Sequence, residues 1–564
     1  MTSGAALTAR VTRGPEGVTV EALSAPIQCQ LDDGRRLLAI AGPHPFDADE
    51  LARWVSRGCP DPAPMRQGFA ACLIDPRTGE VTMVASPRNE VTIFYSQSSS
   101  SLLLSTYIRD LLNHVTTLPA LNLDELAGIA SVSDASHATV FEGIERLPIG
   151  HQAMWRPGSQ AWVRRWFRPH DVEPFDRRRD GDEADVLRQI IREAVDESLP
   201  MRGDVAAHLS GGLDSTTVVA TATSILYPQG RTVHTLSHLT APGEWPEWLP
   251  VESDDEASVR IVSEQVPGID AHLIYNTGQT PLEGLAWMFD RTGYPFLNPS
   301  NSTWIRAFDE RSAQQGLGLT LTGAHGSIAY SVSRMTQYRR ALMHGDVPLL
   351  VGDIKARRAL GDGASLIAHD VLLDLSPALV TGVQRARGTR SDSARRSPVR
   401  WKPMPRSAWE GAVISDPVAP TVLQYPAQSS WFSDPLSDGE VSRLLFSLPA
   451  SAWLGDGRDR ALARRVMRGL VPDEVRLRTA RGMQGLDAAV AVAANQQQYR
   501  EALERVEASS TAAALLDLDS IRDSMIDGVP TEGRESMMWQ LHEGRTLGFG
   551  LFVAWYDDLV AARR

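Results

Sequence analysis

Ser210-Gly211-Gly212-Leu213-Asp214-Ser215 stands between an apolar stretch, 205–209, and a helix-forming stretch, 216–226. The apolar stretch predicts a strand and the second stretch predicts a helix, so the hexapeptide is the loop that joins them. Its glycines let the backbone approach a ligand, its serines supply hydroxyl donors, and the first amides of the helix point toward an anion. We therefore interpret the hexapeptide as a phosphate-binding loop.

Asp214 is the acidic residue of this loop. A magnesium ion that keeps most of its waters needs one or two protein carboxylates, so Asp214 is the predicted magnesium ligand beside bound phosphates. A Walker loop ends in Gly-Lys followed by Ser or Thr, and this sequence contains no such triplet. An ordinary glycine turn is the alternative. In its strand-loop-helix setting, however, the hexapeptide resembles the pyrophosphate loop of enzymes that cleave ATP to AMP and pyrophosphate.

Length and composition limit the classes of protein to consider. A chain of 564 residues with 43% hydrophobic and 22% charged residues predicts two or more globular domains. The net charge of −13 argues against nucleic acid or an anionic membrane as the main partner. Cys29, Cys59 and Cys72 lack metal-ligand spacing and are expected to be reduced and structural. Without a signal-like N-terminus or a long uncharged apolar run, the expected location is the cytoplasm.

The chain divides into a β-rich part and an alternating part. Expected strands of the first part are 36–41, 69–74, 80–85, 92–95 and 102–105, followed by a helix near 107–113. From residue 204 onward, strands are expected at 205–209, 233–239, 271–275 and 317–321, and helices at 256–265 and 303–314. This alternation predicts an α/β fold with a doubly wound parallel sheet.

Ligands of such sheets bind beyond the carboxyl ends of the strands. The phosphate loop, Leu236 with Ser237, and Thr322 with Gly323 follow three of the expected strands. We therefore predict that these residues bind the nucleotide together.

The β-rich part resembles a known domain. Residues 68–112 and 141–151 are similar to the N-terminal glutaminase-type domain of the asparagine synthetase family, which implies an Ntn-type αββα fold. That domain works through an N-terminal cysteine, whereas this sequence starts with Met1-Thr2-Ser3-Gly4 and lacks the glutamine-binding arginine and the Asn-Gly-Glu segment. The resemblance implies a domain at 1–172 that keeps the fold without the chemistry, and a synthetase domain at 184–564. The polar, charge-dense stretch between them, 173–183, is the expected linker.

Leu321-Thr322-Gly323-Ala324-His325-Gly326-Ser327 resembles a second family signature, with one departure. Relatives carry an aspartate that helps to hold magnesium where Ser327 aligns, so Asp214 or another carboxylate must replace that charge. His325 is a candidate base or phosphate contact, with a plain loop histidine as the alternative. Residues 252–256 either cap a helix or let Asp255 or Glu256 face a substrate amine.

The C-terminal part is expected to be mostly helical. Segments 434–438, 460–472 and 478–484 follow the same family, and Arg481 aligns with a lysine that contacts the phosphates and the activated acyl group. Arginine keeps the charge but cannot donate a proton as lysine can, so Arg481 is expected to stabilise the transition state. Residues 333–403 form an expected helical, arginine-rich insertion, which is either a solvated loop or a peptide-binding flap.

Two branches of the family share the loss of glutamine chemistry, the β-lactam synthetases and the lasso peptide macrolactam synthetases. Segment 293–301, the arginine-rich insertion and segment 434–484 resemble the second branch, and Ala324 replaces a tyrosine of the first. The resemblance implies ATP and Mg²⁺ as cofactors and a precursor peptide as substrate. Its side-chain carboxylate is adenylated and its N-terminal amine closes the ring, with release of pyrophosphate and AMP.

The same resemblance implies a separate leader-recognition protein and a leader peptidase as partners, with neither nucleic acid nor membrane involved. A small-molecule amide ligase or β-lactam-forming enzyme is the first alternative, and a scaffold without enzymatic activity is the second.

Overall fold

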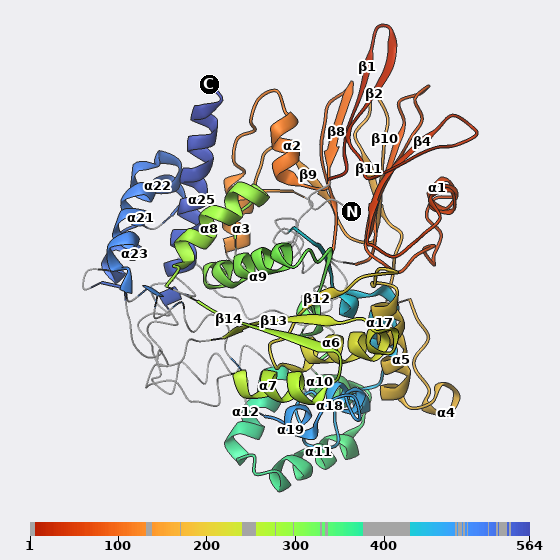
Figure 1. Ribbon diagram of the computed structural model, residues 1–564, viewed down its shortest axis with the longest axis vertical. Helices are drawn as coiled ribbons and strands as arrows, with labels where there is room; N and C mark the ends of the chain where they lie inside the picture. The colour runs from red at the N-terminus through yellow and green to blue at the C-terminus, as the bar shows by residue number, and fades with distance from the viewer. Residues whose placement is uncertain are drawn as a thin grey trace.

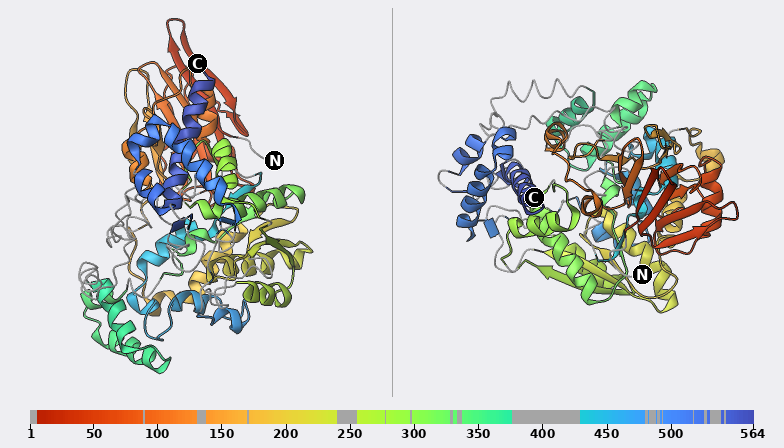
Figure 2. Two further views of the ribbon diagram at one scale, coloured as in Figure 1. Left: turned by 90° about the vertical axis from the view of Figure 1, so that its left-hand side faces the viewer. Right: turned by 90° about the horizontal axis from the view of Figure 1, so that it is seen from above.

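The computed structural model describes residues 6–564 except 89, 131–137, 170, 240–254, 277, 297, 328–329, 333–336, 376–428, 480–481, 483–487, 489–490, 493, 517, 526–527, 530–538 and 541–542. In this described part, two antiparallel sheets form the N-terminal end of the molecule and one parallel sheet lies below them (Figure 1). Helices of the C-terminal part stand beside both regions, as Figure 2 shows from two further directions.

The antiparallel sheets contain the strands up to residue 165. The described five-stranded sheet has the order β2-β1-β8-β7-β9 and the described six-stranded sheet the order β11-β10-β6-β5-β4-β3. The strands of this region are β1 Thr8–Gly14, β2 Gly17–Ser24, β3 Ile27–Gln30, β4 Arg36–Ala41, β5 Phe69–Ile74, β6 Val81–Ala85, β7 Ile93–Gln97, β8 Ser101–Ser105, β9 Glu145–Leu147, β10 His151–Trp155 and β11 Trp162–Arg165.

The two sheets pack face to face, and a helix layer covers each outer face. In β5, Ala70, Cys72 and Ile74 join the core between the sheets, while Phe69, Ala71 and Leu73 pack under α1 (Ala48–Ser56). Because both faces of β5 are covered, its sequence is continuously apolar. On the other side, α2 (Ile108–His114) and α3 (Leu123–Ala130) cover β7 and β8. This layering agrees with the predicted αββα arrangement.

The parallel sheet has the described order β14-β13-β12-β15-β16. Its strands are β12 Val205–His208, β13 Val233–Leu239, β14 Ile269–Tyr275, β15 Leu319–Leu321 and β16 Trp431–Ser433, and every neighbouring pair is parallel. One face is covered by α5 (Glu183–Asp196), α6 (Leu213–Leu226) and α7 (Glu256–Gln265). Phe308 of α9 (Ser302–Gln314) packs on the other face. The predicted doubly wound parallel sheet is therefore confirmed.

Strand order reverses at β12, because β13 lies on one side of it and β15 on the other. The chain that leaves β12 and the chain that leaves β15 therefore separate at the carboxyl edge of the sheet. Open α/β sheets bind their ligands at this position.

The remaining described elements are mainly helical, as expected. The α10–α12 lobe comprises α10 (Tyr338–Met343), α11 (Val347–Ala359) and α12 (Ala364–Leu375). The arginine-rich part of the predicted insertion, 376–403, lies outside the described residues. The following elements are α17 Gly439–Ser447, α18 Ala461–Val466 and α19 Asp473–Arg476.

Four more helices pack on one another and, through α25, on α8 (Pro281–Thr292) and α3: α21 Gln496–Ala508, α22 Ser510–Leu515, α23 Leu518–Ser524 and α25 Glu543–Ala562. Within the predicted linker, Arg177–Asp180 forms the short helix α4. None of the described helices is both long and apolar enough to cross a membrane.

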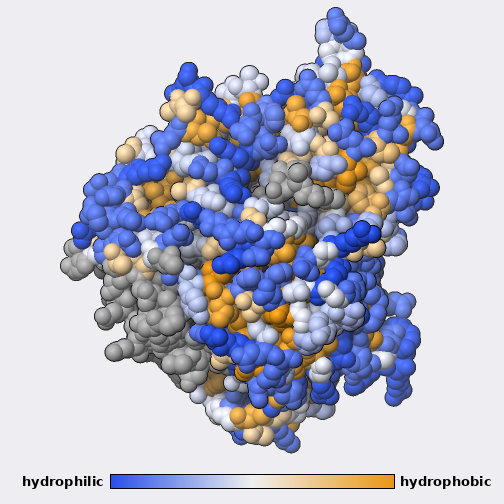
Figure 3. Space-filling view, viewed as in Figure 1, coloured by the Kyte–Doolittle hydropathy of each residue, from blue (hydrophilic) through white to orange (hydrophobic). Residues whose placement is uncertain are grey.

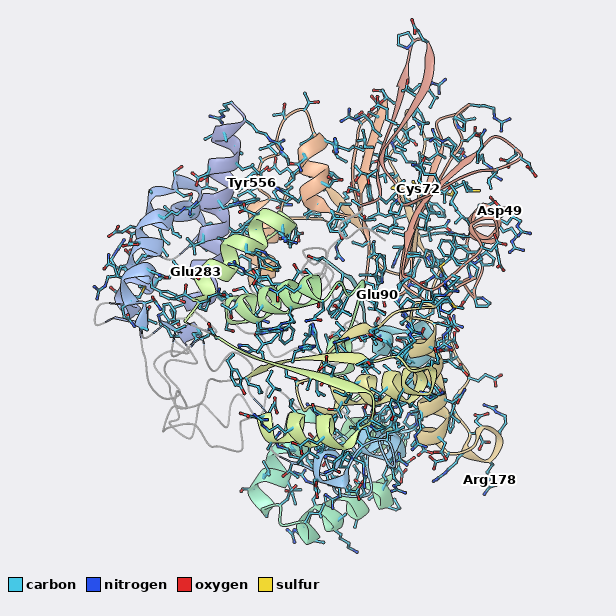
Figure 4. All side chains as sticks on the ribbon, viewed as in Figure 1. Asp49, Cys72, Glu90, Arg178, Glu283 and Tyr556 are labelled. Carbon is cyan, nitrogen blue, oxygen red and sulfur yellow. The ribbon has the colours of Figure 1, made fainter. Side chains whose placement is uncertain are left out.

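A buried ionic cluster joins the N-terminal region to the synthetase region. The guanidinium of Arg88 donates to Glu90 Oε1 at 3.1 Å, to Ser198 Oγ at 2.9 Å and to Asp438 Oδ2 at 3.4 Å. Arg66 also contacts Asp438, with 2.8 Å between Nη2 and Oδ1. Burial alone would raise the pKa of Asp438, but Arg88 and Arg66 hold it below its usual value. Figure 4 shows Glu90 at this junction.

Candidate active site

The loop after β12 is folded tightly onto itself. Ser215 Oγ accepts from the amide of Ser210 at 3.2 Å and lies 3.0 Å from Ser210 Oγ. Gly211 has a φ of +68°, and a Cβ added to it would lie 2.8 Å from Cβ of Ser258. Both the backbone conformation and the space therefore require glycine. Gly212 is the N-cap of α6, whose first residue is Leu213. The loop and the first amides of the helix therefore face the same ligand position.

Leu236 and Ser237 position the strand that leads into the loop. The amide of Leu209 donates to the carbonyl of Leu236 at 3.0 Å, and Ser237 Oγ donates to the carbonyl of Leu209 at 2.7 Å. The side chain of Leu236 is fully buried in the sheet. These two predicted binding residues thus support the loop from the neighbouring strand.

Asp214 lies against the turn that follows β15. A Cβ on Gly323 would lie 2.7 Å from the Asp214 carbonyl carbon, and one on Gly326 would lie 2.6 Å from Asp214 Cγ. The two glycines of the signature therefore allow the turn to close over this aspartate. Thr322 holds the turn to β16 through its amide, which donates to the carbonyl of Ser433 at 2.9 Å.

One oxygen of the Asp214 carboxylate remains available. Ser331 Oγ donates to Oδ2 at 3.0 Å, whereas Oδ1 is enclosed and has no hydrogen-bond partner among the described residues. Burial raises the pKa of Asp214 to about 6, against the opposing effects of Ser331 and Arg460. An unsatisfied carboxylate oxygen in a closed site is costly unless a cation or a donor occupies it. The geometry therefore suits Asp214 as a ligand of a hard cation.

His325 faces away from the loop. Its amide donates to Asp434 Oδ2 at 2.7 Å, which fixes the turn. Its imidazole lines a small cavity of about 20 Å³ with Pro87, Ile149 and Phe167 of the N-terminal region. Burial lowers the pKa of His325 to about 4. The structure thus separates the imidazole from the cavity at the phosphate loop, and a catalytic role for it stays a prediction.

Asp434, which was not assigned a role from the sequence, anchors this turn. It is buried, and burial raises its pKa to about 8, with a further contribution from Glu90. Its Oδ1 accepts from the amide of Leu436 at 3.2 Å. The segment Asp434-Pro-Leu-Ser-Asp438, which resembles the family, was the sequence signal for it, and Asp438 of the same segment joins the two regions.

A cavity of about 450 Å³ opens in front of the phosphate loop. Ser210, Gly211, Gly212 and Leu213 form one wall of it. The arginines among its described lining residues are Arg458, Arg460, Arg464 and Arg478, and the acidic ones are Asp255, Asp362 and Asp459. This volume lies within the range of small-molecule sites, and guanidinium groups are suited to phosphate oxygens.

Four further residues singled out from the sequence are Asp255, Glu256, Arg481 and Ser327. Asp255 lines the cavity, but its carboxylate pairs with Arg478 at 3.1 Å. Glu256 pairs with Arg260 on α7. Arg481 lies outside the described residues, although its neighbours Thr479 and Gly482 line the cavity. Ser327 ends the 324–327 turn, and its side chain is likewise outside the described part.

Adenosine triphosphate and magnesium fit the residues that are present. The glycine-rich loop offers backbone amides, the arginines offer positive charge, and Asp214 Oδ1 offers a carboxylate oxygen without a partner among the described residues. The cavity volume lies within the range for small-molecule ligands such as a nucleotide.

Comparison with known proteins supports this interpretation. Residues 186–327 and 433–552, a little under half of the chain, match the family described as asparagine synthase. The curated Amidase chry2 of Gibberella zeae is 24% identical over 280 residues, which cover 46% of this chain and 39% of that protein. The chain therefore aligns with about two fifths of this relative's length.

Two solved structures show distant likeness. The glutamine phosphoribosylpyrophosphate amidotransferase from B. subtilis, complexed with ADP and GMP, is 9% identical with a TM-score of 0.17, covering 49% of this chain and 75% of its own. A structure described as the allosteric regulatory enzyme of purine biosynthesis is 8% identical with a TM-score of 0.17, covering 48% and 75%. Scores this low carry no argument about the fold.

The matched residues include the phosphate loop, Asp214 and the turn after β15. The match thus supports an asparagine-synthetase-like fold for the synthetase region of the chain.

Proposed function

We propose that this protein joins a carboxylate to an amine through an acyl-adenylate made from ATP. One observation carries the proposal: Asp214, with an unpaired Oδ1 among the described residues, stands on the glycine turn beside a phosphate loop that opens into an arginine-lined cavity. The cavity thus provides positive charge for phosphates, and the loop that lines it also carries the candidate cation ligand.

Two steps follow from this arrangement. A carboxylate oxygen attacks the α-phosphorus of ATP, forming an acyl–O–P bond while the bond to the β-phosphate bridging oxygen breaks and pyrophosphate leaves. The amine nitrogen then attacks the acyl carbon, loses a proton, and releases AMP. The loop amides and the arginines hold the charge that develops on the leaving phosphates. Magnesium, held at Asp214, would supply further neutralisation of that charge.

The amine is expected to belong to the substrate itself. The chain has three cysteines; burial raises the pKa of Cys59 and of Cys72 to about 12, and a hydrogen bond to Asp49 raises the pKa of Cys29. Figure 4 marks Cys72 inside the sheet sandwich. A thiol nucleophile must ionise near neutral pH to release ammonia from glutamine. None of these thiols is arranged for that chemistry.

The finer proposal is closure of a macrolactam ring on a precursor peptide, as in the lasso peptide macrolactam synthetases. Leu360 and Asp362 of the α10–α12 lobe line the cavity, and Leu342, Met343, Val347 and Val351 of the same lobe are exposed. Figure 3 shows apolar residues near the middle and at the lower end of one face of the molecule. An exposed apolar surface on the lobe that borders the nucleotide cavity suits a peptide better than a free amino acid. A leader-recognition protein and a leader peptidase belong to this same proposal.

A small-molecule amide ligase, including a β-lactam-forming enzyme, is the second candidate. The cavity volume of about 450 Å³ favours it, because that space accommodates a nucleotide and a small acyl group but not a folded peptide. The two candidates therefore differ in where the acyl substrate is held.

Mass spectrometry of a candidate precursor peptide, freed of its leader and incubated with the protein, ATP and Mg²⁺, tests the proposal. Loss of one water together with AMP release supports ring closure. AMP release without a change in the peptide points to the small-molecule candidate. The Asp214→Asn variant is the matched control and should show neither product.

If the purified protein gives no ATP cleavage with either substrate class, the assay is repeated with the leader-recognition protein added. Continued absence of pyrophosphate exchange would contradict the ligase assignment and favour the scaffold alternative.

A further inference from the structure

A second cluster of polar side chains lies on the parallel sheet, away from the phosphate loop. His234 is the second residue of β13, and Asp270 is its partner in the register with β14. His272 follows two residues later on β14 and therefore points to the same face of the sheet. The three side chains thus come together on two neighbouring strands, which Figure 1 shows at one edge of the sheet.

Three potential metal-ligand atoms converge in this cluster. His234 Nδ1 lies 3.1 Å from His272 Nε2 and 3.1 Å from Asp270 Oδ2, and His272 Nε2 lies 3.5 Å from that same oxygen. In a tetrahedral zinc site with bonds of about 2.0–2.1 Å, ligand atoms are about 3.3 Å apart. The three atoms therefore form a triangle of the size of one face of that tetrahedron.

The surroundings of His234 match a metal site as well. Its other ring nitrogen, Nε2, lies 3.7 Å from Asp204 Oδ2, while the amide of Thr232 donates to Asp204 Oδ1 at 2.8 Å. A histidine that binds a metal commonly presents its second nitrogen to a carboxylate, which fixes its orientation. Asp204 occupies that position.

Access and charge are also suitable. The side chains of His234 and His272 are each 14% exposed, whereas that of Asp270 is 53% exposed. The two histidines are thus mostly buried, and the cluster is open to solvent on the side of the aspartate. Asp204 and Asp270 contribute two negative charges, against Arg311 of α9, whose charge acts on His272. An open side leaves a coordination position for water.

We propose that His234, Asp270 and His272 bind one divalent transition-metal ion of the zinc class, with Asp204 orienting His234. Imidazole and carboxylate ligands of this kind select zinc and its neighbours over magnesium. The site lies toward the amino ends of the strands, whereas the phosphate loop leaves the carboxyl end of β12. The ion therefore links edge strand β14 to β13 and takes no part in the proposed ligase reaction.

Zinc titration of the chelator-treated full chain, in competition with a chromophoric chelator, tests this proposal. We expect one tight site in the wild type, an affinity loss of more than about 100-fold in His272→Gln, and a loss of about 10–100-fold in Asp204→Asn. His344→Ala is the control, because His344 is exposed at the end of α10. Asp214→Asn is a second control, since zinc held at the nucleotide site would be lost in that variant alone.

Cobalt supplies an independent readout. Cobalt bound by the wild type should show the intense visible absorption of a tetrahedral site, which His272→Gln should lack. Zinc should also raise the thermal midpoint of the wild type and not of His272→Gln. Equal zinc affinity in the wild type and in His272→Gln would overturn the proposal, as would the absence of a tight site in the wild type. In either case, the cluster is a hydrogen-bonded group without a metal.

Discussion

The guanidinium of Arg88 lies 3.4 Å from the carboxylate of Asp438, and both groups are fully buried between the N-terminal and synthetase regions. Removing Arg88 would leave Asp438 and Glu90 as buried charges with fewer partners. We expect Arg88→Ala to lower the free energy of unfolding by about 3–5 kcal/mol.

Arg156→Ala is the matched control for this pair, because Arg156 and Glu80 form an exposed ion pair. Exposed pairs contribute about 0–1 kcal/mol. Urea denaturation of both variants measures the difference. Equal stability of the two variants would show that the buried cluster does not hold the two regions together.

Gly326→Ala should affect activity more than stability. A Cβ at this position would lie 2.6 Å from Cγ of Asp214, so the carboxylate must move away from the turn and from its present position. Misplacement of a reacting or binding group by about 1 Å can reduce the rate about 100-fold. ATP–pyrophosphate exchange is the measurement, with Gly352→Ala as control because Gly352 of α11 has open space around it. Unchanged exchange in Gly326→Ala would contradict the role of this turn.

Asp214 should couple stability to pH. Burial raises its pKa from 3.8 to about 6, so the unfolded state loses its proton at a lower pH than the folded state, and stability falls as the pH rises through that interval. The stability lost is complete above pH 6 and amounts to about 3 kcal/mol at most. Asp214→Asn should therefore unfold at higher urea concentration than the wild type at pH 8 without metal, yet lose pyrophosphate exchange. A less stable variant at pH 8 would argue against this burial effect.

Magnesium dependence should follow the same ionisation. A metal ligand must be deprotonated, so the magnesium concentration for half-maximal pyrophosphate exchange should increase by about tenfold as the pH falls from 7 to 5. Enzyme without the Asp214 carboxylate cannot show this change. A magnesium requirement that is constant with pH would indicate another ligand.

Local sequence patterns predicted the elements that carry the site. Strand 233–239 and helix 256–265 agree with the structure to the residue, because each is an apolar pattern bounded by polar residues. The hairpin of β1 and β2 was missed, although Val18, Val20 and Ala22 alternate with polar residues along β2. That alternation was a usable signal for a strand at the edge of a sheet.

Features that depend on long-range packing were not predictable in this way. Strand β16 has three residues and pairs with β15 from more than a hundred positions away, so no local pattern identifies it. Arg460 and Arg478 line the same cavity as the phosphate loop because α18 packs on α6 and α19 packs on α7. Asp255 precedes α7 without a side-chain capping hydrogen bond, and its carboxylate lines the cavity and pairs with Arg478. A role facing the substrate amine stays a prediction.

Substitution of Arg460 tests whether a strained backbone conformation is kept in the wall of the cavity for phosphate binding. It lines the cavity and has a φ of +58°, a left-handed conformation that costs a residue with a side chain about 1–2 kcal/mol. Arg460→Gly should relieve that strain, whereas Arg460→Ala removes the same charge and keeps the strain. We expect both variants to bind pyrophosphate more weakly, and the glycine variant to be more stable than the alanine variant by about 1 kcal/mol. Because both lack the guanidinium, the difference in their urea midpoints measures the backbone strain less the greater entropy of glycine in the unfolded chain. Equal midpoints would mean that the surrounding α18 packing, and not the conformation of Arg460, sets the stability of this wall of the cavity.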